Sequence, residues 1–183
     1  MPLLIDCNGK DDFKACIRLL PIQGTQITTF CRGKGYSTSA LTSGAFAVTM
    51  GICTYRQEAL FSTIWNGRNK DSPGSLGMFV KTLPVCCHTD GGTTVADYVK
   101  SVGDQILMSI ENDLFSFAEI SRAYDIKADL NLAWQGEQED RLTLGGLTCR
   151  SVPVRLDTAK FPLSVDVMHR DGKISYFAEY RSD

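Results

Sequence analysis

The chain has 183 residues, of which 43% are hydrophobic and 22% are charged, and its formal net charge is −2. This size and composition indicate one globular domain or one lobe of a larger protein, and the slight negative charge argues against general binding of nucleic acid or of an anionic membrane surface. No apolar run approaches the roughly 18 residues that a membrane-spanning helix needs, and the N-terminus turns acidic too soon for a secretory signal, so we expect a cytoplasmic protein.

The first third of the chain predicts a strand followed by two helices. The strand is expected over 13–23 and a short helix over 25–35. A longer helix is expected over 36–56, where apolar residues recur every three or four positions and Ser37 or Thr38 can cap the first turn. Its small and apolar residues indicate a buried helix whose glycine and alanines permit close approach by a neighbour.

Two strands and two helices are predicted in the middle of the chain. One strand runs over 59–68 to an Asn-Gly turn, and the second runs over 76–87 and stops at Pro84 or soon after. An amphipathic helix is expected over 95–113, and a shorter helix over 115–125.

From residue 129 onward the sequence alternates between apolar and polar residues, which is typical of strands. Strands are expected at 129–137, 141–148 and 151–157, and a hairpin that turns at Asp171-Gly172 is expected within 161–183. Helices therefore dominate the first part and strands the last, which predicts an α/β (α+β) fold with a mixed sheet.

Candidate catalytic residues are few, because the chain has only two histidines. His88 could act as an acid–base group beside Asp90, although we favour a solvated loop at a strand end. His169 precedes the predicted hairpin turn and is expected to be exposed. Arg68 ends a strand at a glycine turn, where a guanidinium can bind a carboxylate through two hydrogen bonds. We favour a structural ion pair for Arg68, with a carboxylate that need not belong to this chain.

Seven cysteines are present, an odd number, and no C-x-x-C pair occurs. This pattern supports neither a disulfide framework nor a metal site. Most of the cysteines stand among apolar residues, so buried, reduced thiols are expected. A metal site at Cys86, Cys87 and His88 is disfavoured, because consecutive residues of a strand face opposite sides of a sheet.

Five segments in order resemble the condensation domains of non-ribosomal peptide synthetases. "GRNKDSPGSLGMFVKTLPV" resembles the family's G-R and "iGxFVNTlplR" signature, and "NDLFSFAEI" resembles its "HQdyPFe" motif. The other three segments are "FCRGKGYSTSALTSGAFAVTM", "ADLNLAWQGE" and "AKFPLSVDVMHRDGKISYFAEYRSD". The resemblance runs from about Phe13 to the C-terminus.

This resemblance implies two chloramphenicol acetyltransferase-like lobes with a tunnel between them, in which an acceptor amine attacks a donor thioester and an amide forms. The family's catalytic motif H-H-x-x-x-D-G lies in the N-terminal lobe and is absent here. Residues 1–183 are therefore expected to be the C-terminal lobe alone, a single chloramphenicol acetyltransferase-like lobe of a larger multidomain synthetase. It would have no catalytic residue and no metal of its own, and would be inactive by itself.

The resemblance also assigns roles to single residues. Arg68 matches the arginine that pairs with the motif aspartate of the other lobe. The residues that match the tunnel-lining strand are Gly77, Phe79, Val80, Lys81 and Thr82. Lys81 stands where the family usually has Asn, Asn112 where it often has His, and Ser116 where it has Pro, which indicates a divergent or specialised relative.

The expected partners are the missing N-terminal lobe, peptidyl carrier proteins and an adjacent adenylation domain. Substrates would arrive on phosphopantetheine arms, with no cofactor bound directly, and a homodimer could form through the exposed lobe surface. Three alternatives stay open: a lobe of an epimerisation domain, a lobe of a related thioester acyltransferase, and a stand-alone, non-catalytic module that binds carrier or other proteins.

Overall fold

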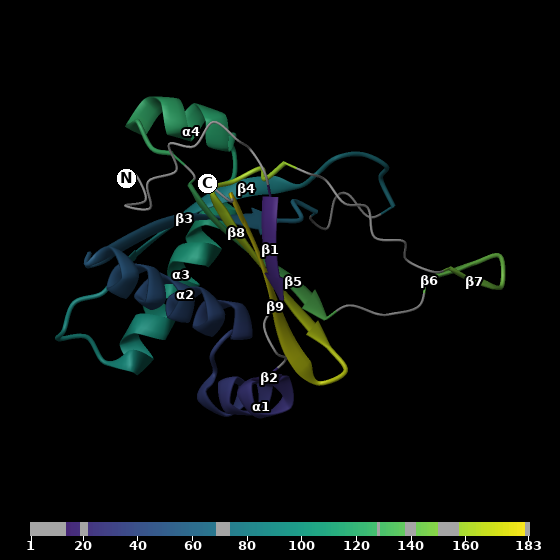
Figure 1. Cartoon of the computed structure of the whole chain (residues 1–183), viewed down its shortest axis with the longest axis horizontal. Helices are drawn as coiled ribbons and strands as arrows, with labels where there is room; N and C mark the ends of the chain where they lie inside the picture. The colour runs from purple at the N-terminus through teal and green to yellow at the C-terminus, as the bar shows by residue number, and fades with distance from the viewer. Residues whose placement is uncertain are drawn as a thin grey trace.

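The computed structural model describes residues 14–18, 22–68, 74–127, 129–137, 142–149 and 158–181. Within them, one mixed β-sheet runs through the molecule and helices lie against it (Figure 1). The predicted α/β (α+β) lobe, a mixed sheet flanked by helices, is confirmed. In this described part, no helix is both long and apolar enough to cross a bilayer.

The sheet has seven strands in the spatial order β1–β9–β8–β5–β3–β4, and β2 also pairs with β9. Their bounds are β1 Lys14–Arg18, β2 Ile22–Gln23, β3 Glu58–Trp65, β4 Lys81–His88, β5 Leu130–Glu137, β8 Leu163–Arg170 and β9 Lys173–Arg181. The β3–β5 and β5–β8 pairs are parallel, and the other pairs are antiparallel. Strand β4 therefore forms one edge of the sheet.

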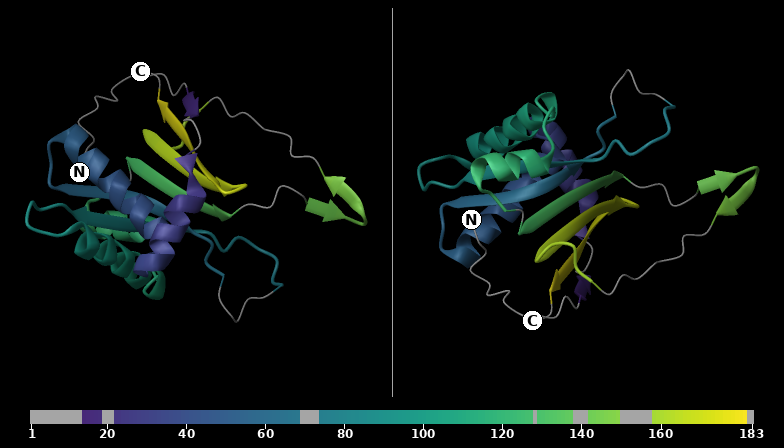
Figure 2. Two further views of the ribbon diagram at one scale, coloured as in Figure 1. Left: turned by 90° about the horizontal axis from the view of Figure 1, so that it is seen from below. Right: turned by 90° about the horizontal axis from the view of Figure 1, so that it is seen from above.

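The helices of the described residues are α1 Gly24–Lys34, α2 Thr38–Thr54, α3 Val95–Glu111 and α4 Phe117–Tyr124. Figures 1 and 2 show α1, α2 and α3 on one side of the sheet, and α4 lies next to the edge strand β4. The predicted cap at Ser37 is confirmed, since its side chain accepts a hydrogen bond from the amide of Ala40, and Thr94 caps α3 in the same way through the amide of Asp97. Gly35 ends α1 in the left-handed conformation.

The hydrophobic core lies between the sheet and the helices α2 and α3. Phe61 of β3 is 1% exposed, and its ring meets the ring of Phe46 edge-on at 5.2 Å between centroids. A Cβ on Gly44 of α2 would lie 3.1 Å from the ring of Tyr98, whose hydroxyl donates to the Gly44 carbonyl at 3.2 Å. The predicted close approach at this glycine is therefore confirmed, and it brings α3 against α2.

The predicted bounds of the strand over 76–87 are wrong. Strand β4 begins at Lys81 and continues through Pro84 to His88. Pro84 is tolerated because β4 is an edge strand, in which alternate residues need no backbone donor for the neighbouring strand. Residues 76–80 precede β4 and do not form part of a strand.

In the C-terminal part the hairpin of β8 and β9 is confirmed. Asp171 and Gly172 have φ angles of 50° and 68°, as a two-residue type I′ turn requires. The strand predicted over 141–148 is wrong, because the segment forms a short hairpin of β6 Leu142–Leu144 and β7 Leu147–Cys149. The strand predicted over 151–157 lies outside the described residues.

Candidate functional site

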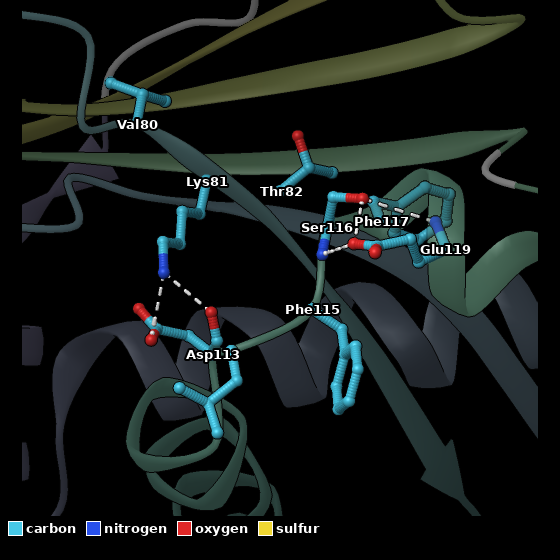
Figure 3. Close-up of a pocket in the computed structure, with 9 residues that line it drawn as sticks. Val80, Lys81, Thr82, Asp113, Phe115, Ser116, Phe117 and Glu119 are labelled. Carbon is cyan, nitrogen blue, oxygen red and sulfur yellow. Dashed lines mark hydrogen bonds and ion pairs between the residues drawn. The ribbon is translucent and has the colours of Figure 1, made fainter.

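A cleft of about 420 Å³ lies between the start of β4 and the segment that joins α3 to α4. Its volume is within the usual range of small-molecule sites, about 300–1,000 Å³. The residues that line it are Val80, Lys81, Thr82, Asp113, Leu114, Phe115, Ser116, Phe117 and Glu119 (Figure 3). The cleft thus unites the two sequence segments that resemble family motifs, "GMFVKT" and "NDLFSF".

An ion pair joins the two walls of this cleft. The ammonium of Lys81 lies 3.0 Å from a carboxylate oxygen of Asp113 and donates to the backbone carbonyl of Asp113 at 2.6 Å (Figure 3). The side chains are 40% and 23% exposed, so water screens the pair only in part. Lys81 therefore fixes the distance between β4 and the α3–α4 segment, and its charge is largely neutralised.

The N-terminus of α4 forms the other side of the cleft. Ser116 caps α4, accepting from the amide of Glu119 at 3.3 Å, while the Glu119 carboxylate accepts from the amide and hydroxyl of Ser116 at 2.8 and 2.7 Å. These hydrogen bonds hold the pKa of Glu119 below its usual range. This capping box was missed from the sequence, although the S-x-x-E spacing that signals it is present at 116–119.

Arg68 lies outside this cleft, in the exposed turn after β3. One guanidinium nitrogen, Nη1, donates to the Ser75 carbonyl at 2.9 Å, and the carbon Cζ sits 4.5 Å from the centroid of the Phe79 ring. Gly67 makes this arrangement possible, since its φ is 65° and a Cβ there would lie 1.8 Å from the Phe79 carbonyl oxygen. Within the described ranges no carboxylate pairs with Arg68, so Nε and Nη2 have no partner among those residues.

The structure therefore divides the predicted tunnel-lining residues into two groups. Val80, Lys81 and Thr82 line the cleft. Phe79 lies beneath Arg68, and Gly77, whose φ is 149°, packs against the Phe79 ring. The opposite wall matched a family motif in the sequence but was given no role in the site, because the α3–α4 segment becomes a neighbour of β4 only through the fold.

The histidines differ from each other in burial. His88 is exposed at the end of β4, and its Nδ1 lies 3.6 Å from a carboxylate oxygen of Glu58 rather than near the cleft. The expectation that His169 is exposed is wrong: this side chain is half-buried against Gly24, and its buried Nε2 has no hydrogen-bond partner among the described residues.

The cysteines are buried only in part, so the prediction is wrong for Cys53 and Cys86, which are exposed. Cys31 and Cys87 are buried as predicted, and burial raises the pKa of Cys87 to about 12. Cys86 and Cys87 face opposite sides of the sheet, in agreement with the argument against a metal site at 86–88. Over the described ranges no group of His, Cys, Asp and Glu side chains is arranged to hold a metal ion.

Comparisons with known proteins give one family. A family model described as "Condensation domain" matches residues 9–183. Bacitracin synthase 3 of Bacillus licheniformis is 23% identical over 164 residues, which are 85% of this chain but only 3% of that protein. The chain therefore spans a small part of the curated relative it matches.

Two solved structures share the fold. Holo-AB3403, a four-domain nonribosomal peptide synthetase, aligns with a TM-score of 0.78 at 16% identity, covering 94% of this chain and 15% of that one. The epimerization domain of tyrocidine synthetase B aligns with a TM-score of 0.69 at 13% identity, covering 97% of this chain and 44% of that one.

Proposed function

Because this chain belongs to the condensation domain family, we propose that residues 1–183 form the C-terminal lobe of a condensation domain in a non-ribosomal peptide synthetase. The observation that carries the proposal is the family match over residues 9–183. The sequence contains no H-H-x-x-x-D-G motif. The chemistry would need residues supplied by the remainder of the domain.

In the proposed reaction the amine of an acceptor aminoacyl thioester attacks the carbonyl carbon of a donor thioester. The C–N bond forms, the C–S bond breaks, and the thiol of the donor carrier leaves with a proton. This lobe would contribute one wall of the tunnel, in which Lys81 and Asp113 hold β4 and the α3–α4 segment at a fixed separation. Its role is therefore to position substrates and exclude water, while proton transfer falls to the other lobe.

Arg68 is proposed to join the lobes. Its contacts with Ser75 and Phe79 hold the guanidinium in one orientation, and no described residue occupies the Nε and Nη2 edge, to which a carboxylate could bind. Two parallel hydrogen bonds to a carboxylate are the strongest pairing that arginine makes. A carboxylate of the N-terminal lobe is the partner we propose.

An exposed apolar surface supports a missing partner as well. Leu76 and Met78, in the segment before β4, are 100% and 87% exposed. Exposed apolar side chains of this size are the kind that a contact with another protein covers. We propose that the N-terminal lobe covers them, and that the isolated chain tends to self-associate through the same surface.

The remaining partners follow from the proposed reaction. Peptidyl carrier proteins would bring both substrates on phosphopantetheine arms, an adenylation domain would lie nearby in the same protein, and the assembly would be cytoplasmic. Holo-AB3403 is a four-domain synthetase, which supports a multidomain setting.

The test is amide formation by the protein that the gene encodes. Carrier proteins loaded with donor and acceptor aminoacyl thioesters are mixed with the full-length protein or with this chain alone, and the dipeptidyl thioester is measured by mass spectrometry. The proposal predicts product with the full-length protein and none above background with this chain. Product from this chain alone would contradict it.

Arg68 is tested in the same assay. Arg68→Ala should slow amide formation by at least about tenfold, since it leaves a buried carboxylate unpaired in the other lobe. Arg32→Ala, an exposed arginine of α1, is the matched control. Equal rates for the two variants would contradict the role proposed for Arg68.

Epimerisation is a second candidate for the parent activity. The epimerization domain of tyrocidine synthetase B shares the fold over 97% of this chain, so the fold is compatible with this activity as well. Incubating a carrier-bound L-aminoacyl thioester with the full-length protein and analysing the released amino acid on a chiral column distinguishes the two. Conversion to the D-form without amide formation would favour epimerisation.

A further inference from the structure

The backbone N–H and C=O groups along the outer edge of β4 could bind a further strand. Among the described residues, strand β4 is the end of the sheet and pairs only with β3. In an antiparallel pair, residues alternate between those whose N–H and C=O both bond to the partner strand and those whose N–H and C=O both point away. Every second residue of β4 therefore turns its C=O, and its N–H where it has one, away from β3 toward the sheet edge.

Two observations identify those residues. The amide of Thr89 donates to the carbonyl of Gln57 at 2.6 Å, one position beyond the paired residues His88 and Glu58, so odd-numbered residues of β4 bond to β3. Pro84, which has no N–H, stands at an even position, where β3 requires no donor. Its carbonyl accepts from the Ser109 hydroxyl at 3.3 Å, outside the β3–β4 ladder.

Thr82 is thus an outward-facing residue of β4, and it lies in the cleft (Figure 3). In the described part of the chain its backbone makes no hydrogen bond outside the sheet. Pro84 interrupts the row of donors on one side of Thr82, and Asp113 to Phe117 form the facing wall. An unpaired strand edge beside a cleft is the setting in which an extended peptide adds to a sheet.

We propose that the edge of β4 at Thr82 binds an extended peptide as an added strand. One residue that offers both N–H and C=O is complementary to one α-amino acid residue, which presents C=O and N–H at the matching spacing. Val80, Leu114 and Phe115 give the cleft apolar walls, which suit apolar side chains of that peptide. Identifying the peptide with the donor chain of a peptidyl thioester rests on the proposed function, whereas the pairing rests on the geometry of β4.

The test is binding of a blocked tripeptide, acetyl-Ala-Val-Ala-N-methylamide, to the ¹⁵N-labelled full chain. Titrations followed by NMR give the dissociation constant and the shift of the Thr82 amide. A second probe is the depsipeptide in which an ester oxygen replaces the valine N–H, and a third is pantetheine. The variants are Thr82→Pro, which removes the outward donor, and Cys86→Pro, which removes an outward donor of β4 outside the cleft.

The tripeptide should move the Thr82 amide resonance. Its binding should weaken about fivefold in Thr82→Pro and change by less than about twofold in Cys86→Pro, the effect expected for one lost hydrogen bond. The depsipeptide should bind the unaltered chain about fivefold more weakly than the tripeptide, and this comparison decides the matter even if Thr82→Pro does not fold.

Three results would overturn the proposal: a folded Thr82→Pro chain that binds the tripeptide unchanged, a depsipeptide that binds as tightly as the tripeptide, or a Thr82 shift with pantetheine but not with the tripeptide. Peptide binding with no amide formation by the full-length protein would remove the proposed function and leave the pairing intact. Amide formation with no peptide binding at Thr82 would support the proposed function and remove the proposed pairing.

Discussion

Gly67→Ala is expected to displace the turn that carries Arg68. A φ of 65° at this position disfavours an L-residue, and a Cβ would lie 1.8 Å from the carbonyl oxygen of Phe79, so one of the two backbone segments must move. The movement would break the contact of Arg68 with the Phe79 ring and its hydrogen bond to Ser75. Adding the cost of the left-handed conformation, the ring contact and the hydrogen bond gives a loss of about 2 to 4 kcal/mol in the free energy of unfolding.

Urea unfolding of the two chains, followed by circular dichroism, measures this loss. Gly33→Ala is the matched control, because Gly33 lies in α1 and a Cβ there meets no atom within 4 Å. The control should be stabilised by about 0.5 to 1 kcal/mol, the usual gain from alanine over glycine in a helix. A Gly67→Ala chain whose free energy of unfolding lies within about 0.5 kcal/mol of the unaltered chain would refute the reasoning.

Three further predictions concern other contacts. Asn131 is 3% exposed, and its side-chain amide accepts a hydrogen bond from Ser62 and donates one to Ser164. Asn131→Ala should therefore lower the free energy of unfolding by about 2 to 3 kcal/mol in urea denaturation. A loss below about 0.5 kcal/mol would contradict this account of the buried amide. A double-mutant cycle of Lys81→Ala and Asp113→Ala should give a coupling of about 0.5 to 1 kcal/mol, as for partly exposed ion pairs, and zero coupling would show that the pair does not join the cleft walls. Hydrogen bonds from Ser116 lower the folded-state pKa of Glu119, so the carboxylate stabilises α4 above pH 4.5 and this stabilisation is lost as the pH falls through the lower folded value. The difference in α4 helicity between the unaltered chain and Glu119→Gln, measured by NMR, should therefore shrink below pH 4.5. A difference that stays constant with pH would contradict this role of Glu119.

The sequence predicted the helices and the C-terminal hairpin well because their signals are local. Ser37 and Thr94 cap helices through bonds to amides three residues away, and Asp171-Gly172 suits a two-residue turn. Strand β4 was less predictable, since its start depends on where β3 ends and its passage through Pro84 depends on its place at the sheet edge. Both conditions are properties of the sheet and not of the segment.

The candidate site was predictable on one wall only. Val80, Lys81 and Thr82 follow from their match to a family signature, and the structure places all three in the cleft. Asp113 lies in a segment that also resembles a family motif, but its role was not predicted, because its pairing with Lys81 joins residues that are distant in sequence. His169 was misjudged for a similar reason: the hairpin turn beside it is local, but its burial depends on packing against Gly24.

The most direct test of the central claim is the reading frame around this segment, sequenced several hundred codons upstream. If the chain is the C-terminal lobe of a condensation domain, the frame continues upstream and encodes a lobe that contains H-H-x-x-x-D-G. An in-frame stop codon immediately before Met1 would contradict the claim and leave a stand-alone binding module as the better account.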